Sequence, residues 1–229
     1  MVNRNLIIMS LVSLLGFSCS TSEQSANGPA FSTASEGMVK KPEIDFPLYL
    51  TSKIENRTEI VAKTSADVFI VHTGHLLNPL YSKEQNEELL TSLKDKGIDL
   101  VNLTLEDFII ASNQEINFEN YPQKFLNSSV MDLQLDSFIT LKNVTPFFAH
   151  GNVVFVGISD KNIDPSLSLD KFLVSDYVLS VLRARKLALG GGKNSLLAPR
   201  AFVIVQNIGA EINDVMDRLP PNFINSLAN

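Results

Sequence analysis

Unbroken apolar runs alternate with amphipathic stretches along the chain from residue 67 onward. Residues 67–71 read DVFIV and residues 98–103 read IDLVNL, and both are rich in β-branched and aliphatic side chains. Short apolar runs without polar alternation are typical of strands that are buried on both faces. We therefore predict a buried strand at each of these two places.

The stretch between these strands, residues 82–97, has the pattern of a helix. Ser82 and Gln85 have the spacing of a capping box, and Gly97 stands where a helix would end. An apolar stripe at helical spacing is formed by Leu89, Leu90 and Leu93. Strand, helix and strand joined by short connections predict a βαβ unit, in which the two strands pair in parallel.

The middle of the chain has a different pattern. Residues 113–137 are polar and weakly periodic, which predicts a long loop with a short strand near Phe125. Residues 138–159 contain two apolar runs separated by His150-Gly151-Asn152. This triplet is a hairpin turn signal, so we expect antiparallel strands on either side of it.

The last part of the chain returns to alternating helix and strand. Residues 175–192 predict a helix that ends at three glycines, residues 201–205 read AFVIV as a strand, and a short amphipathic helix follows through Leu219. The sequence thus predicts an α/β domain with a mixed, largely parallel sheet flanked by helices.

The N-terminus has the pattern of a bacterial export signal. Arg4 gives residues 1–18 a positive start, and residues 6–15 form an apolar segment too short to span a bilayer permanently. The following LLGFSC resembles a bacterial lipobox, which implies that Cys19 is lipidated and becomes the mature N-terminus. An ordinary cleaved signal and a buried thiol are the alternatives. Ser20 after the cysteine favours the outer over the inner membrane.

Residues 19–42 are rich in Ser, Thr, Ala and Gly and have almost no bulky apolar side chains. Such a segment cannot bury enough surface to offset the entropy of ordering it. We expect a flexible tether here, linking the membrane to a domain at residues 43–229.

The composition bears on partners. The chain has 19 Lys and Arg against 25 Asp and Glu, a net charge of −6. Nucleic-acid binding depends on clustered positive charge, and no basic stripe is visible, so we expect no nucleic-acid partner. The expected contacts are the membrane, through the N-terminal lipid, and an envelope protein of unknown kind.

The order of segments resembles a known family. DVFIVHTGHLL, a helix and then GIDLVNLTLEDF are similar to the N-terminal domain of calcineurin-like metallophosphoesterases of the 5′-nucleotidase and UDP-sugar hydrolase branch. There, a strand ending in Asp-x-Gly-Asp is followed by a helix and by a strand ending in Gly-Asn-His-Glu. The resemblance covers about residues 65–219 and implies an incomplete metallophosphoesterase-like fold. A degenerate lipoprotein subgroup of this family is the nearer match.

The resemblance also implies that most metal ligands of the family are replaced. The bridging Asp is His75 here, the metal-binding Asn is Leu105, the catalytic His is Glu106, and a metal-binding His is Asn207. Neither the first Asp-x-His pair of the family, expected within residues 47–56, nor its final Gly-His-x-His motif has a counterpart. Two metal ions need a bridging carboxylate, and a neutral imidazole has one lone pair for one metal. We therefore expect no cofactor.

Two interpretations of the remaining polar residues follow. In the first, His72 and His75 are surface or loop histidines at a vestigial site, and Glu106 and Asp107 cap the helix that starts there. In the second, weaker one, His72, His75, Glu106 and Asp107 supply a site for one divalent metal such as Zn²⁺ or Mn²⁺.

We expect a non-catalytic, membrane-anchored envelope module that binds or scaffolds. The alternatives are a phosphoester hydrolase with a remodelled single-metal site, and an accessory subunit whose partner supplies a nucleotide-binding domain.

Overall fold

Three sheets organise the chain in the computed structural model, which describes residues 44–64, 67–161, 163, 167, 170–190, 201–206, 208 and 211–225. The first sheet is parallel throughout, with the order β1-β2-β3-β4-β7. Its strands are β1 (Leu48–Thr51), β2 (Phe69–His72), β3 (Leu100–Asn102), β4 (Lys124–Leu126) and β7 (Val144–Thr145). The predicted βαβ unit is confirmed in β2 and β3.

The second sheet is mixed, with the order β12-β11-β9-β8. Only β8 runs antiparallel to its neighbour, and it forms the predicted hairpin with β9. The strands of this second sheet are β8 (Phe147–His150), β9 (Val153–Gly157), β11 (Ala201–Val205) and β12 (Phe223–Asn225). A small antiparallel third sheet comprises β5 (Val130–Asp132), β6 (Ser137–Phe138) and β10 (Phe172–Val174).

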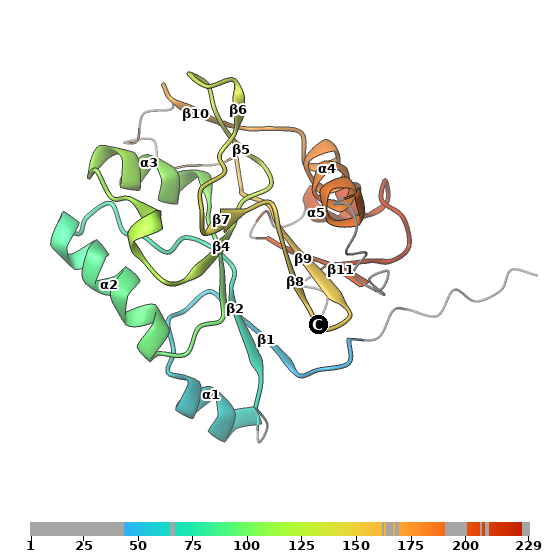
Figure 1. The fold of residues 1–229 in the computed structure, drawn as a ribbon, viewed down its shortest axis with the longest axis horizontal. Helices are drawn as coiled ribbons and strands as arrows, with labels where there is room; N and C mark the ends of the chain where they lie inside the picture. Colours follow the sequence, from blue (N-terminus) through green and yellow to red (C-terminus); the bar gives the residue numbers. More distant parts are fainter. Residues whose placement is uncertain are drawn as a thin grey trace, which may run out of the picture. The chain divides into compact units, whose positions relative to one another are not determined.

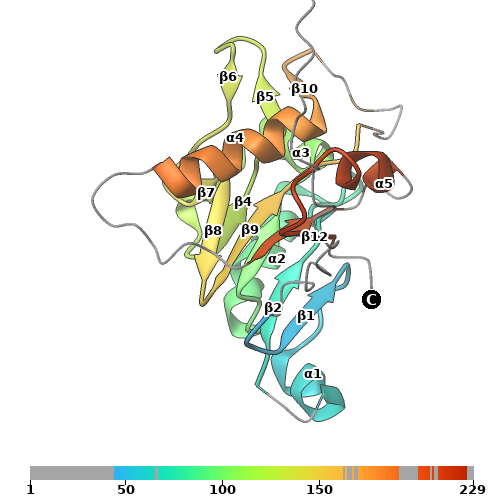
Figure 2. The same cartoon turned by 90° about the vertical axis from the view of Figure 1, so that its right-hand side faces the viewer.

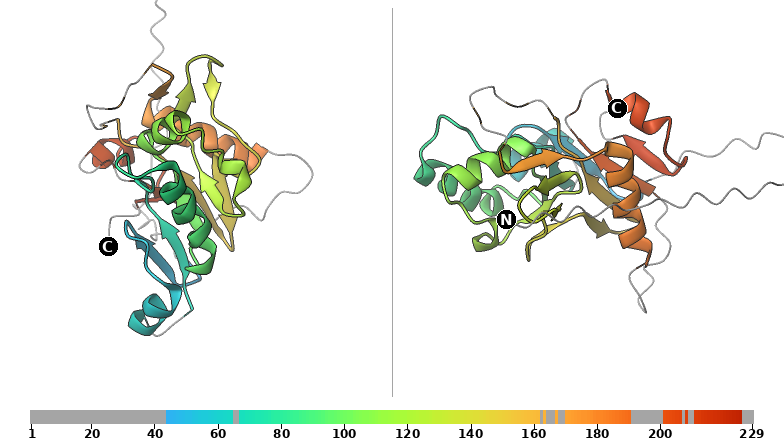
Figure 3. Two further views of the ribbon diagram at one scale, coloured as in Figure 1. Left: turned by 90° about the vertical axis from the view of Figure 1, so that its left-hand side faces the viewer. Right: turned by 90° about the horizontal axis from the view of Figure 1, so that it is seen from above.

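The first two sheets pack face to face, with helices on both outer sides (Figure 1). The side of the first sheet carries α1 (Arg57–Thr64), α2 (Lys83–Asp95), α3 (Leu105–Asn113) and the 3₁₀ helix η1 (Phe118–Asn120). The second sheet is covered by α4 (Tyr177–Gly190) and α5 (Glu211–Met216). The same layers are seen from above in the right-hand view of Figure 3. None of the described helices is long and apolar enough to cross a membrane.

The layering explains why the strands are apolar at every position. In β9, Val153 and Phe155 face the core between the two sheets, whereas Val154 and Val156 face the core under α4 and α5. Successive side chains of a strand point to opposite faces, so both sets must be apolar when both faces are covered.

The predicted fold class is confirmed. Helices α2 and α4 form within the predicted residues 82–97 and 175–192, and a strand forms at residues 201–205. The capping box of Ser82 and Gln85 is present. The prediction for residues 113–137 was partly wrong: besides β4 at Phe125 this stretch contains η1, β5 and the start of β6. β5 and β6 form a hairpin that extends beside α4 (Figure 2). These short strands mix polar and apolar residues, so the sequence pattern did not indicate them.

Candidate functional site

Buried polar residues gather at the carboxyl ends of the central strands. They stand at the last position of a strand or within two residues of it, and they are His72, Asn102, Asn127, Ser159 and Gln206. Each of them is 1% exposed or less. The carboxyl edge of parallel strands is where open α/β sheets bind ligands, so this edge is the candidate site.

Asn102 joins the two sheets at this edge. Its Nδ2 donates to the backbone oxygen of Thr73 at 3.1 Å and to that of Ile158 at 2.9 Å. Its Oδ1 is buried and makes no hydrogen bond to a described residue. One amide group thus links the segment after β2 to the segment after β9.

His72 ends β2 and is 1% exposed, so the expectation of a surface or loop histidine was wrong for it. Its Nδ1 accepts a hydrogen bond from the backbone amide of Gly74 at 3.3 Å. Burial lowers the pKa of His72, and the nearby Asp107 carboxyl opposes the shift. His72 is therefore a neutral core imidazole, because charging it would require a positive charge in the interior.

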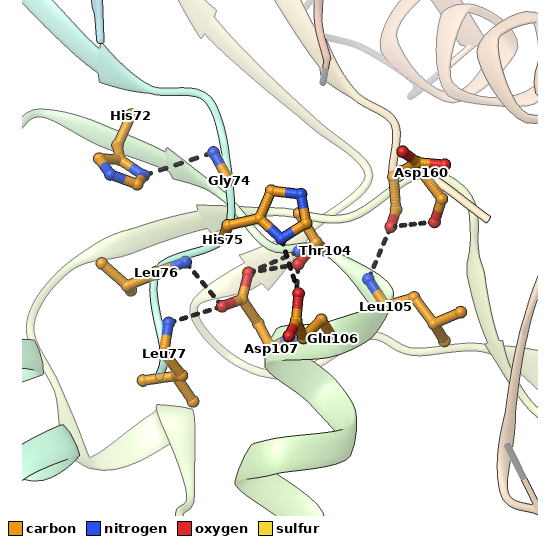
Figure 4. Close-up of polar contacts among 11 residues, drawn as sticks. His72, Gly74, His75, Leu76, Leu77, Thr104, Leu105, Glu106, Asp107 and Asp160 are labelled. Atoms are coloured by element: carbon orange, nitrogen blue, oxygen red, sulfur yellow. Dashed lines mark hydrogen bonds and ion pairs between the residues drawn. The ribbon is translucent and has the colours of Figure 1, made fainter. Parts of the chain in front are cut away.

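His75 lies on the surface, as expected, and faces Glu106 (Figure 4). Its Nδ1 is 2.9 Å from the Glu106 carboxylate, and the two side chains are 46% and 16% exposed. The loop that presents it is tight: Gly74 has a φ of +127°, and a Cβ there would lie 2.4 Å from the Thr104 methyl group. Only glycine lets this turn lie so close to the start of α3.

Asp107 turns inward and closes the same loop onto α3. One carboxylate oxygen accepts from the backbone amides of Leu76 and Leu77, both at 2.8 Å. The other accepts from the amide and the hydroxyl of Thr104, also at 2.8 Å. Burial raises the pKa of Asp107, and the hydrogen bonds from Leu77 and Thr104 oppose this. The capping interpretation is confirmed for Asp107, which forms a capping box with Thr104.

The structure brings together two of the four candidate ligands, His75 and Glu106. The oxygens of Asp107 are occupied by four donors, and His72 is enclosed. Across the described ranges, no group of three or more His, Cys, Asp or Glu side chains is placed to hold a metal ion. Asn207 and Cys19 lie outside the described residues, as do the predicted boundaries at residues 18 and 42.

Leu105 does not point toward the site. Its side chain is 2% exposed and belongs to the core beneath the helices of the first sheet. Its backbone amide donates to the hydroxyl of Ser159 at 2.6 Å, which ties the start of α3 to the end of β9. Sequence reasoning missed Asn102 and Ser159, although each is a polar residue ending an apolar run.

Comparisons with known proteins give a likeness in fold. No protein-family model matches the chain, and no curated protein matches its sequence. Among solved structures, it is similar to the sulfate thiohydrolase SoxB of Thermus thermophilus in complex with glycerol, with a TM-score of 0.53 and 12% identity. The match covers 73% of this chain and 31% of that chain, so this chain spans less than a third of that protein. This distant likeness is consistent with the metallophosphoesterase-like fold predicted from the sequence.

Proposed function

We propose that this protein is a non-catalytic module of the bacterial envelope, held to the membrane by a lipid on Cys19, that binds or scaffolds through a metallophosphoesterase-like domain. The observation that carries the proposal is that Asp107, at the carboxyl edge of the first sheet, has a structural role. Its carboxylate accepts four hydrogen bonds from Leu76, Leu77 and Thr104, which connect the loop after β2 to the start of α3.

The charge at the aligned positions supports the same proposal. Two divalent ions held a few ångströms apart repel strongly, and several carboxylates with a bridging oxygen are needed to stabilise them. Among His75, Leu105, Glu106 and Asn207, Glu106 alone carries a negative charge. The side chain at position 105 lies in the core, so its direction as well as its chemistry argues against a ligand role.

Membrane attachment rests on the sequence of the N-terminus. A cysteine that ends an export signal and begins a polar tether is the expected acceptor of the anchor. Two or more acyl chains together make anchoring stable, whereas a single chain is readily released. An outer-membrane location follows from Ser20 by analogy with enteric bacteria.

The contact between His75 and Glu106 favours one second candidate, a hydrolase with a single-metal site. The imidazole of His75, on the exposed loop after β2, lies 2.9 Å from the carboxylate of Glu106 in the first turn of α3, and both are groups that Zn²⁺ or Mn²⁺ binds. Such a site would need further ligands from water or from residues beyond the described ranges.

The two candidates are separated by metal loading and an activity screen. The full-length protein, purified in detergent, is loaded with Zn²⁺ or Mn²⁺, its bound metal is measured, and nucleotide and phosphodiester hydrolysis are assayed. We expect no turnover above that of free metal. Turnover that is lost in both His75→Ala and Glu106→Gln, and kept in His150→Ala, would overturn the non-catalytic proposal.

A further inference from the structure

A pocket of about 310 Å³ lies between α3, η1 and the β5–β6 hairpin. None of its lining residues belongs to the carboxyl-edge site around His75 and Glu106. Small-molecule sites have volumes of roughly 300–1,000 Å³ and combine apolar walls with a few polar groups. The pocket is therefore large enough for a small ligand.

The inner wall is aromatic and already packed. Phe108, Phe118 and Phe172 are 4%, 2% and 6% exposed, and the ring of Phe108 lies 5.7 Å from that of Phe118 and 6.1 Å from that of Phe172. All three rings belong to the hydrophobic core, so this wall of the pocket is already formed before a ligand binds. Binding therefore does not have to order these side chains.

The hairpin contributes Phe138 to the lining of the pocket. The guanidinium carbon of Arg183, on α4, lies 3.8 Å from the centre of the Phe138 ring. This cation–π contact holds the hairpin ring in place from α4. The lining of the pocket thus includes aromatic rings from the core and from the hairpin, each of which contacts a neighbouring element.

One positive charge lines the pocket. The ammonium of Lys171 is 3.4 Å from the Ser112 hydroxyl and 5.2 Å from the centre of the Phe172 ring. Lys171 forms no ion pair with a described residue. The carboxylate in the lining, Asp132, accepts from the backbone amides of Gln134 and Leu135 at 2.8 and 3.2 Å. These amides stabilise the Asp132 carboxylate by hydrogen bonding, and no ion pair among the described residues joins Asp132 to Lys171.

We propose that this pocket binds a small amphipathic carboxylate. Its apolar or aromatic body lies against Phe108, Phe138 and Phe172, and its carboxylate accepts hydrogen bonds from Lys171 and Ser112. The proposal goes beyond the envelope module proposed above, because it names a ligand class and does not depend on the state of the carboxyl-edge site.

The test uses 4-phenylbutyrate and its neutral counterpart 4-phenylbutanamide, which share an aromatic body and differ in charge. Binding to the full-length protein in phospholipid nanodiscs is followed by ligand-observed NMR, with empty nanodiscs as the blank. We expect the acid to bind more tightly than the amide. Lys171→Gln should weaken binding of the acid about five-fold, the effect of a partly exposed ion pair, and leave that of the amide unchanged.

Two further variants and one control complete the test. Ala111→Leu fills the pocket from α3, and Thr140→Trp blocks it from an exposed position. Both variants should abolish binding of both probes. Thr140→Trp is included because Ala111 is buried and its replacement can lower stability. Lys124→Gln makes the same charge change outside the pocket and should leave binding intact. Equal affinity for acid and amide, an equal loss in Lys124→Gln, or a signal no larger than that of empty nanodiscs overturns the proposal.

Discussion

The side-chain oxygen of Asn102 lies against Gly157, at a place where no other residue type fits between the two sheets. A Cβ at Gly157 would lie 2.2 Å from Oδ1 of Asn102 and 2.7 Å from Cβ of Leu126. The same Asn102 donates to the oxygen of Ile158, the residue after Gly157. The missing side chain and the amide bridge together let the sheets approach closely at their carboxyl edge.

Gly157→Ala should therefore destabilise the protein by about 2 kcal/mol or more, because an added methyl group in a packed core forces neighbouring atoms to move. Chemical denaturation measures the change. Gly190→Ala is the matched control, since nothing lies within 4 Å of a Cβ there and alanine favours a helix. The double variant with Asn102→Ala should lose less than the sum of the two single losses; simple additivity contradicts the close contact.

Asp107→Asn should lower the free energy of unfolding by about 2–3 kcal/mol, because an amide nitrogen would face buried backbone donors that the carboxylate now satisfies. Glu106→Gln, the same charge change one residue earlier, should cost less than about 1 kcal/mol, since its partner His75 is exposed to solvent. Urea denaturation of both variants tests the difference, and equal losses would argue against a structural role specific to Asp107.

His72 should make stability depend on pH. Its pKa in the folded protein is below the ordinary 6.5, so below pH 6.5 the unfolded chain binds a proton that the folded chain does not. The contribution of His72 to stability should be constant above this range and fall as the pH drops toward the lowered pKa, by up to about 1.4 kcal/mol per pH unit.

The measurement is urea denaturation between pH 7.5 and 5. His72→Gln should flatten this part of the pH dependence, whereas His75→Gln, at an exposed position, should retain it. A slope that survives in His72→Gln would assign the effect to another group.

Cys19→Ala should abolish incorporation of a labelled fatty acid in a bacterial host and remove the acyl mass from the purified protein. Ser20→Ala, the neighbouring control, should retain both. Full labelling of Cys19→Ala, or an unmodified Cys19 in the parent protein, would exclude a lipid at this position.

The sequence by itself determined the strands and helices that belong to continuous apolar or periodic patterns. Residues 68–71 are all apolar, and residues 98–103 are apolar apart from Asp99 and Asn102, because both faces of these strands are covered. This pattern can be recognised in the sequence alone. The helix after Ser82 could also be predicted from the sequence, because its capping box involves only Ser82 and Gln85, which are close together in the chain. The fold class could be predicted as well, because the order of strands and helices along the chain is a property of the sequence.

Tertiary structure alone decided which side chains meet. Nothing in the sequence shows that the strands divide between two facing sheets, because an apolar strand can face any second layer. Nor does it show that Asp107 reaches back to Leu76 and Leu77, 31 and 30 positions away in the chain, or that Asn102 reaches Ile158, 56 positions away. His72 and His75 are three residues apart and alike in sequence, yet one is enclosed at the end of β2 and the other exposed, because Gly74 turns the chain between them.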